Sequence, residues 1–222
     1  MRNGSRLRAA VFDFDGTLAR PALDFPLMKR RIGELASTLI GTPVIPGGLP
    51  ALEWIEALCV LMTSAQAADF RRNSHSLIEG MEREAAARTS LFEFVRPMLS
   101  RLSERGVALA VITRNSRQAV EAVFPDASRY LAAVLAREDV AAVKPDPAHL
   151  LSALGLLDAS PGEALMVGDH PLDVLTARRA GVLAGAVASG ETPLSELQEA
   201  GPDFLAMDAR ELFERLEAQG WF

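Results

Sequence analysis

The second half of the chain alternates short apolar runs with amphipathic helical patterns, and this alternation constrains the fold more than any other feature. Strands that alternate with helices predict a parallel sheet with helices on both faces. We therefore expect an α/β fold with a Rossmann-like parallel sheet, which binds ligands beyond the carboxyl ends of its strands. The predicted strands cover 107–113, 130–136, 164–167, 182–188 and 203–206, and the predicted helices 97–105, 115–124, 146–154, 171–180 and 208–218.

Residues 21–92 interrupt this alternation. Apolar side chains recur there at helical spacing in three sets, separated in one place by a connector rich in proline and glycine at 42–50. We expect a small α-helical subdomain at 21–92, inserted into a core formed by 1–20 and 93–222. The three sets are Leu27, Met28, Ile32, Leu35 and Leu39; Leu49, Leu52, Ile55, Leu58 and Met62; and Phe70, Leu77, Ile78 and Met81.

Composition restricts the partners that this chain can have. Its net charge of −6 argues against a nucleic-acid-binding surface but allows small phosphorylated ligands. No segment approaches the roughly twenty apolar residues that span a bilayer, and the apolar run before Asp13 is too short for a signal peptide. The single cysteine, Cys59, fits a reducing compartment and a buried structural thiol. We expect a cytoplasmic protein without nucleic-acid or membrane partners, and the oligomeric state stays open.

Two acidic residues follow the first predicted strand, Ala9–Phe12. Asp13 and Asp15 are two positions apart, so an extended backbone places both carboxylates on one face. Close carboxylates repel each other and resist desolvation, so folding alone gives no reason for the pair. A divalent cation combined with covalent or acid–base chemistry does give one. The competing interpretation is that each aspartate only forms a turn or caps a helix.

Three further polar motifs fall at predicted strand ends. Thr113 closes one strand and precedes Arg114 and Asn115, and Lys144 begins a Lys-Pro-Asp-Pro stretch. A Gly-Asp-x-x-x-Asp pattern with Asp169 and Asp173 follows the strand at 164–167. Because parallel strands end at a common edge, these side chains are expected to meet.

This ordered set of motifs resembles the haloacid dehalogenase superfamily. It is most similar to the phosphatase-type members that carry a helical cap after the first motif, and among them to phosphoglycolate phosphatases. The likeness covers nearly the whole chain. It implies a phosphatase acting on a small phosphorylated metabolite, with sugar phosphates, nucleoside monophosphates and pyrophosphate also open. Dehalogenases of the superfamily lack an acid at the position of Asp15, because a halide leaves without protonation, so Asp15 favours phosphoryl transfer.

The resemblance implies a role for each motif residue. Asp13 would be the nucleophile that forms an aspartyl-phosphate, and Asp15 would protonate the leaving oxygen and later activate water. Lys144 would pair with Asp13 and the phosphoryl oxygens, and Thr113 would hydrogen-bond the phosphoryl group. Mg²⁺ is the expected cofactor, with Asp13, Asp15, Asp169 and Asp173 as its ligand set. Substrate contacts are expected from Phe14, Arg114 and Asn115.

Two alternatives stay open at this point. One is a phosphoryl-transferring mutase similar to β-phosphoglucomutase, which uses the same aspartate pair. The other is a non-catalytic binding or regulatory member of the same fold. Two local questions also remain: whether Asp173 binds metal directly or orients a ligand, and whether His170 is only an exposed loop residue. The basic residues of the insertion are expected to lie on polar helix faces rather than to bind substrate.

Overall fold

The structure is a computed structural model that describes residues 6–222, so the first five residues of the predicted core lie outside the described part. It divides into two compact units. One unit comprises Met1–Pro21 and Thr89–Phe222, and the other comprises Ala22–Arg88. The first holds the sheet and the second is helical.

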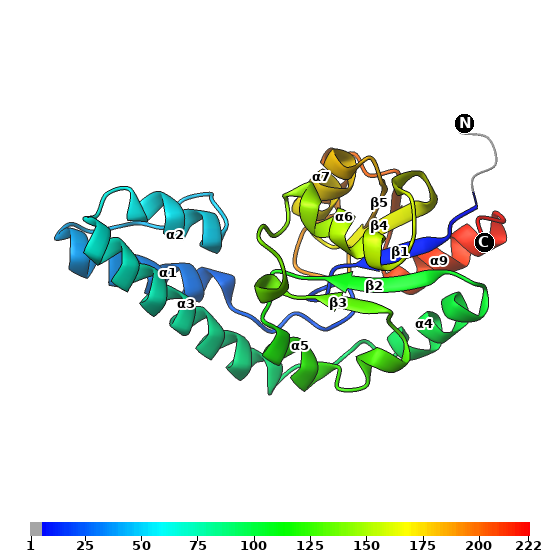
Figure 1. Cartoon of the computed structure of the whole chain (residues 1–222), viewed down its shortest axis with the longest axis horizontal. Helices are drawn as coiled ribbons and strands as arrows, with labels where there is room; N and C mark the ends of the chain where they lie inside the picture. The colour runs from blue at the N-terminus through cyan, green and yellow to red at the C-terminus, as the bar shows by residue number, and fades with distance from the viewer. Residues whose placement is uncertain (1–5) are drawn as a thin grey trace. The chain divides into compact units, whose positions relative to one another are not determined.

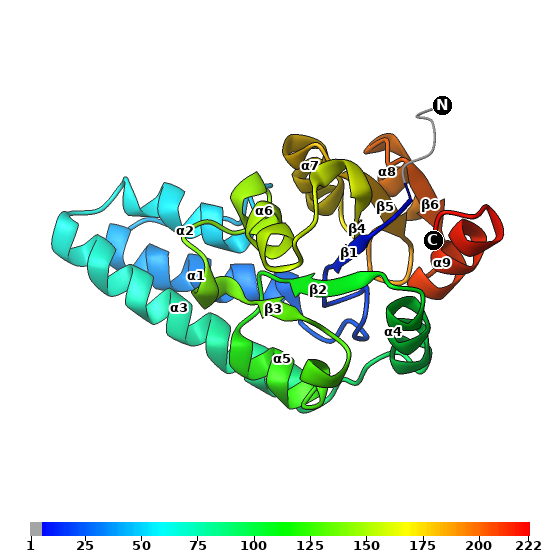
Figure 2. The same cartoon turned by 45° about the vertical axis from the view of Figure 1, so that its right-hand side comes forward.

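Six parallel strands form the sheet, in the order β3-β2-β1-β4-β5-β6 (Figures 1 and 2). This confirms the predicted parallel α/β fold. The central strand β1 is apolar and buried along its whole length, as expected for a parallel strand that is covered on both faces. The strands are β1 (Ala9–Phe12), β2 (Ala108–Ile112), β3 (Ala133–Leu135), β4 (Ala164–Gly168), β5 (Leu183–Val187) and β6 (Phe204–Ala206).

Helices cover both faces of the sheet (Figure 2). On one face lie α4 (Val95–Glu104), α5 (Arg117–Val123) and α9 (Ala209–Ala218), and on the other α6 (Pro147–Leu156), α7 (Pro171–Ala180) and α8 (Leu194–Glu199). Successive side chains of β1 point to opposite faces of the sheet, so the strand packs against the helices on both sides. Ala10 and Phe12 pack into the first, and Ala9 and Val11 into the second.

Two elements differ from the sequence prediction. The strand expected at 130–136 is limited to β3, because the chain turns before it and the Tyr130 ring packs beside Phe124 with centroids 5.8 Å apart. Helix α8 was not predicted. It has six residues, too few for a helical period to stand out from the surrounding polar sequence.

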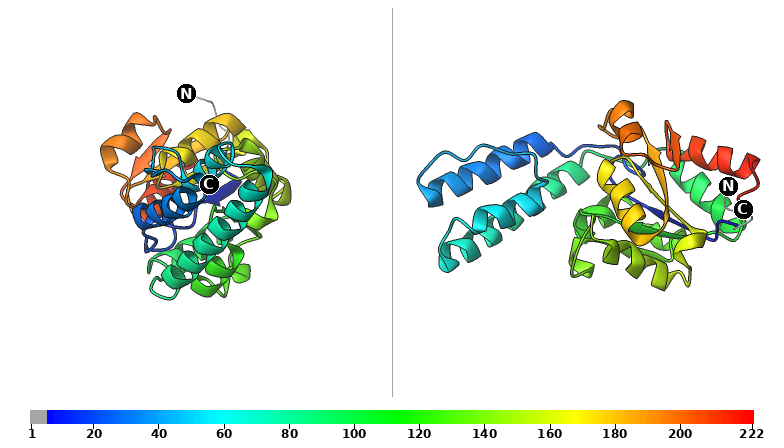
Figure 3. Two further views of the ribbon diagram at one scale, coloured as in Figure 1. Left: turned by 90° about the vertical axis from the view of Figure 1, so that its left-hand side faces the viewer. Right: turned by 90° about the horizontal axis from the view of Figure 1, so that it is seen from above.

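The second unit is an insertion of three helices (Figure 3), and these helices enclose their own apolar core. It contains α1 (Phe25–Ile40), α2 (Ala51–Cys59) and α3 (Ser64–Ala86), which match the three predicted apolar sets. Local signals set the helix ends: the Asp24 carboxylate accepts from the Leu27 N–H at 2.7 Å, and α1 stops at Gly41 with φ +80°. Cys59 is buried in this core, as expected.

Basic side chains of the insertion find partners within it. Arg71 forms a two-pronged ion pair with Glu56, and Arg72 pairs with Asp69 one turn earlier. Both arginines are exposed, which supports the polar-face interpretation. Among the described residues, no helix combines the length and apolar character that crossing a membrane requires.

The strand order reverses between β1 and β4. These two strands are neighbours, although the chain forms β2 and β3 between them. Ligands of doubly wound sheets bind at the carboxyl ends of the strands on either side of such a reversal. Asp13 follows β1 there, and Asp169 follows β4.

Candidate active site

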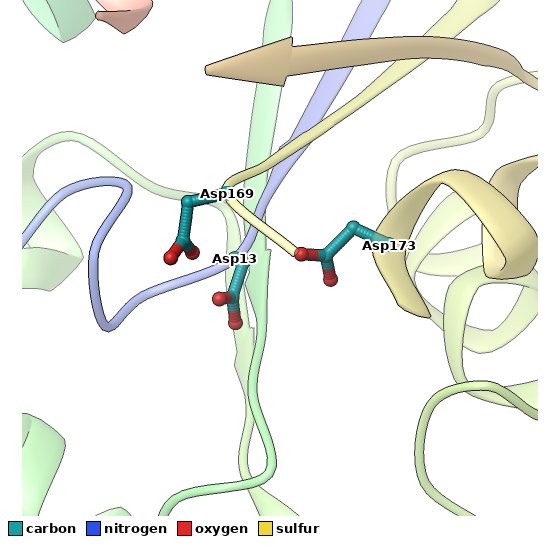
Figure 4. A group of neighbouring side chains, drawn as sticks. All are labelled: Asp13, Asp169 and Asp173. Carbon is teal, nitrogen blue, oxygen red and sulfur yellow. The ribbon is translucent and has the colours of Figure 1, made fainter. Parts of the chain in front are cut away.

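Three carboxylates converge at the reversal point (Figure 4). Asp13 directly follows β1, Asp169 directly follows β4, and Asp173 lies in the first turn of α7. One oxygen from each lies within 4.8 Å of the others. The structure therefore brings together three of the four residues that the sequence predicts as metal ligands.

Lys144 is buried against this cluster. Its ammonium Nζ donates to Asp13 Oδ1 at 2.5 Å and to Asp173 Oδ1 at 2.7 Å. Burial disfavours the charged ammonium, but the negative charges of Asp13 and Asp173 outweigh it and raise the pKa of Lys144 above its usual value. The lysine is thus a permanent positive charge bridging two carboxylates.

Asp173 has two roles, one in its helix and one in the site. Its Oδ2 accepts from the His170 backbone N–H at 3.1 Å and thereby caps the start of α7, while Oδ1 binds Lys144. His170 is exposed, and its Nδ1 accepts from the Leu172 N–H. His170 therefore serves as the N-cap of α7.

The carboxyl group of Asp169 lacks a positive partner of its own. Burial, and then the negative charges of Asp13 and Asp173, raise the pKa of Asp169 to about 9. Its Oδ1 accepts from the Thr17 hydroxyl at 3.2 Å. If all three groups were ionised, they would share the single ammonium of Lys144. Without a cation Asp169 holds a proton instead, and a divalent cation would supply the positive charge in place of that proton. Carboxylate oxygens are ligands that Mg²⁺ and Ca²⁺ prefer.

Glycines allow the backbone to approach these carboxylates closely. A Cβ atom at Gly190 would lie 1.8 Å from Asp169 Oδ2, and one at Gly16 would lie 2.3 Å from the same atom. At Gly168, a Cβ would lie 2.1 Å from Asp173 Oδ2. The loop after β5 is tied to the loop after β1 by the Ser189 hydroxyl, which donates to the Gly16 carbonyl at 2.7 Å. Closely packed oxygen donors with surplus negative charge fit a small divalent cation.

Thr113 and Asn115 bring the end of β2 to the same place. Thr113 is buried, and its Oγ1 accepts from the Asn115 backbone N–H at 3.0 Å, so its own hydroxyl hydrogen remains available as a donor. The Asn115 side-chain amide donates to Asp15 Oδ2 at 2.9 Å. Phe14 has a fully buried side chain, so a substrate contact of this residue would have to come from its backbone.

The loop that carries Lys144 is fixed by hydrogen bonds to three side chains, those of Arg114, His149 and Arg179. The Arg114 guanidinium donates to the Lys144 carbonyl, and Arg179 donates to the Pro145 carbonyl at 3.1 Å. His149 Nδ1 accepts from the Lys144 N–H at 3.3 Å. Arg114 thus contacts the loop that carries Lys144, and its predicted contact with substrate stays a prediction.

His149 was not found from the sequence. Burial lowers its pKa to about 4, so the ring is neutral near pH 7. Since Nδ1 accepts from Lys144, the ring proton lies on Nε2 and is donated to the Leu135 carbonyl at 3.1 Å. The available signal was a histidine on the apolar face of α6, beside Leu150 and Ala153.

A family model described as haloacid dehalogenase-like hydrolase matches residues 55–187. The chain belongs to this family. The matched stretch contains Thr113, Lys144, Asp169 and Asp173, whereas Asp13 and Asp15 precede it.

The chain is also similar to relatives of known name. The chain is 35% identical over 116 residues to pyrophosphatase PpaX of Bacillus cereus, covering 51% of this chain and 54% of the relative. It is 28% identical over 193 residues to N-acetylmuramic acid 6-phosphate phosphatase of Pseudomonas putida, covering 83% and 84%. The chain thus spans only about half the length of the pyrophosphatase that it matches.

Solved structures share the whole fold. A hydrolase from Pseudomonas syringae matches with a TM-score of 0.72 at 22% identity, over 95% of this chain and 98% of the other. A family IA haloacid dehalogenase hydrolase from Entamoeba histolytica gives a TM-score of 0.69 at 19% identity, over 95% and 100%. At these identities the likeness concerns the fold alone.

Proposed function

We propose that this protein is a Mg²⁺-dependent phosphatase that hydrolyses a small phosphorylated metabolite through an aspartyl-phosphate on Asp13. The observation that carries the proposal is the Asp13–Lys144 contact of 2.5 Å inside a cluster of three carboxylates. Asp13, Asp169 and Asp173, with the backbone carbonyl of Asp15, would hold the cation. When bound, Mg²⁺ supplies positive charge that offsets the repulsion between carboxylate and phosphate.

The first step transfers the phosphoryl group to the protein. A carboxylate oxygen of Asp13 attacks phosphorus, the bond from phosphorus to the leaving oxygen breaks, and Asp15 gives its proton to that oxygen. Lys144 stabilises the charge on Asp13 and on the phosphoryl oxygens. The Thr113 hydroxyl donates a hydrogen bond to the same group.

The second step restores the protein. Asp15, now a carboxylate, takes a proton from water while the water oxygen attacks the phosphorus of the aspartyl-phosphate. The bond between Asp13 and phosphorus breaks, and inorganic phosphate is released. One residue thus serves as acid and then as base, which requires it to lie beside Asp13 without being paired to Lys144.

Phosphoglycolate is our first candidate substrate, because the core motifs are similar to that branch. Inorganic pyrophosphate is a second candidate, supported by the 35% identity to pyrophosphatase PpaX. N-acetylmuramic acid 6-phosphate is a third, supported by a relative matched over 83% of this chain. All three present a phosphoryl dianion to the same carboxylate.

A screen of the purified protein tests the proposal. Release of inorganic phosphate is measured against a panel of phosphorylated metabolites and pyrophosphate, with Mg²⁺ and with EDTA, and substrates are ranked by kcat/KM. We expect steady turnover that EDTA abolishes and that Asp13→Asn removes. Turnover indifferent to EDTA would contradict the metal assignment. Conversion of a sugar phosphate to its isomer without phosphate release would favour the mutase.

A further inference from the structure

A buried imidazole joins the backbones of two predicted catalytic residues. His149 lies in the first turn of α6, and its side chain is fully buried. Its Nδ1 accepts from the Lys144 backbone N–H at 3.3 Å, and its Nε2 donates to the Leu135 carbonyl at 3.1 Å. The Leu135 carbonyl also accepts from the Thr113 backbone N–H at 3.0 Å. A continuous chain of three hydrogen bonds therefore links the Lys144 backbone to the Thr113 backbone.

The two ends of this chain carry side chains that the proposed reaction has to hold at one place. Lys144 lies in a turn between β3 and α6, so contacts with neighbouring elements set its position. Its Nζ nevertheless reaches Asp13 Oδ1 at 2.5 Å, at the end of β1. Thr113 follows β2, the strand that pairs with β1. Because all of these residues belong to one compact unit, the chain of hydrogen bonds is a property of the core itself.

A neutral imidazole is suited to this position because it offers an acceptor and a donor on one rigid ring. Burial lowers the pKa of His149 to about 4, so the ring is neutral near pH 7 and carries its proton on Nε2. The competing interpretation is that the ring only satisfies a buried backbone N–H, as any acceptor at this position would. The two interpretations differ in what they predict for turnover.

We propose that His149 is a positioning residue, which fixes the Lys144 backbone against the end of β3 so that the lysine ammonium stays on Asp13. The inference rests on the proposed function and deepens it, because it assigns the placement of Lys144 to a residue that does not touch the substrate. Displacement of a catalytic group by about 1 Å is enough to slow a reaction strongly.

Three substitutions at position 149 separate the two hydrogen bonds of the ring. In His149→Asn, the side-chain oxygen is bonded to Cγ as Nδ1 is, so it can still accept from the Lys144 N–H. In His149→Gln, the side-chain nitrogen lies one bond further out, as Nε2 does, so it can still donate to the Leu135 carbonyl. His149→Leu removes both bonds. The matched control is Leu154→Ala, which removes buried apolar packing from the same helix and leaves the chain of hydrogen bonds in place.

The order of activities distinguishes positioning from structural support. We expect kcat/KM for p-nitrophenyl phosphate with Mg²⁺ to fall about tenfold or more in His149→Leu. His149→Asn should retain more activity than His149→Gln, because only the asparagine keeps the bond to the Lys144 N–H. Leu154→Ala should lower the urea midpoint but leave kcat/KM close to the wild-type value. Far-UV circular dichroism and urea midpoints check that each variant is folded at the assay temperature.

Nuclear magnetic resonance tests the hydrogen bonds without turnover. In protein labelled with ¹⁵N-histidine, long-range ¹H–¹⁵N correlations report which ring nitrogen of each of the three histidines carries the proton. We expect His149 to show the Nε2–H tautomer with slow exchange against water, and its signals are assigned by their loss in His149→Gln. A proton on Nδ1 would overturn the inference, because that nitrogen could not accept from Lys144.

Three kinetic results would also overturn the inference. One is wild-type kcat/KM in all three His149 variants, and another is equal activity of His149→Asn and His149→Gln. The third is a loss in Leu154→Ala as large as that in His149→Leu. Should His149→Leu fail to fold, the comparison of His149→Asn with His149→Gln decides. Failure of the proposed function looks different, because the wild-type protein would then release no phosphate from p-nitrophenyl phosphate or from the metabolite panel, whereas the His149 resonances are observed with or without turnover.

Discussion

Lys144 of the α/β unit and two arginines of the helical insertion are held in opposite ways. Lys144 is 3% exposed and contacts carboxylates that lie 131 and 29 residues away in the sequence. Arg71 and Arg72, by contrast, pair on the solvent-exposed surface with acids of the same three-helix unit. Burying a charge is costly unless several elements of the fold supply its partners. We therefore propose that the chemistry of this protein takes place where a buried charge has partners from distant segments of the sequence.

The largest expected effect comes from Asp13. Asp13→Asn should lower turnover about a thousandfold or more, because the amide cannot form the covalent intermediate. The matched control is Glu56→Gln, which breaks the exposed pair with Arg71 in the insertion and should leave turnover nearly unchanged. Phosphate-release assays measure both. Substantial activity in Asp13→Asn would refute its assignment as the nucleophile.

Removing Lys144 should destabilise the core far more than removing Arg71 affects the insertion. Lys144→Met leaves the buried Asp173 and the partly buried Asp13 without their ammonium and should cost about 3–5 kcal/mol of unfolding free energy. Arg71→Met removes an exposed partner and should barely move the urea midpoint. Equal shifts of the urea midpoint in Lys144→Met and Arg71→Met would contradict the expected difference between the buried and the exposed charge.

Asp169 makes the metal-free protein sensitive to alkali. The pKa of Asp169 is raised from 3.8 to about 9, so the folded chain holds a proton that the unfolded chain has released. Unfolding free energy should therefore fall as pH rises through this window, by roughly 3 kcal/mol from about pH 6 to about pH 8 in EDTA. Urea titrations measure it, with Asp169→Asn as the variant that lacks the slope. Mg²⁺ should reduce the loss because it stabilises the ionised carboxylate.

His149 should give the opposite slope in acid. The pKa of His149 is lowered from 6.5 to about 4 in the folded chain. Between these two pH values the unfolded chain therefore binds a proton at His149 and the folded chain does not. Unfolding free energy is then lost as pH falls from about 6.5 to about 4, by roughly 2 kcal/mol in wild type relative to His149→Gln. Parallel pH profiles for the two proteins would contradict the buried neutral imidazole.

Much of the fold could be predicted from the sequence because it follows from local patterns. The apolar run Ala9–Phe12 is β1, and the three apolar sets of the insertion are α1, α2 and α3. Gly41 and the Asp24 cap mark helix ends by chemistry that acts within a few residues. The start of β3 was predicted too early, because Tyr130 to Ala132 are apolar for packing reasons rather than for strand pairing.

The arrangement of the candidate site could be predicted from the sequence only in part. Topology predicts that Asp13 and Asp169 meet, because neighbouring parallel strands end at one edge. Which atom contacts which depends on loop geometry, which sequence spacing does not encode. The Asn115–Asp15 contact and the His149–Lys144 contact belong to that second kind.

The glycines around the carboxylates have a consequence for how relatives of this chain are compared. A single added methyl group at Gly190 would overlap Asp169, and one at Gly168 would overlap Asp173, although neither change touches an acidic residue. Such a change would require Asp169 or Asp173 to move while every aspartate, threonine and lysine of the motifs stays in place. Comparisons of related chains should therefore include these glycines together with the acids, because an intact motif beside an alanine at position 190 would accompany a displaced Asp169.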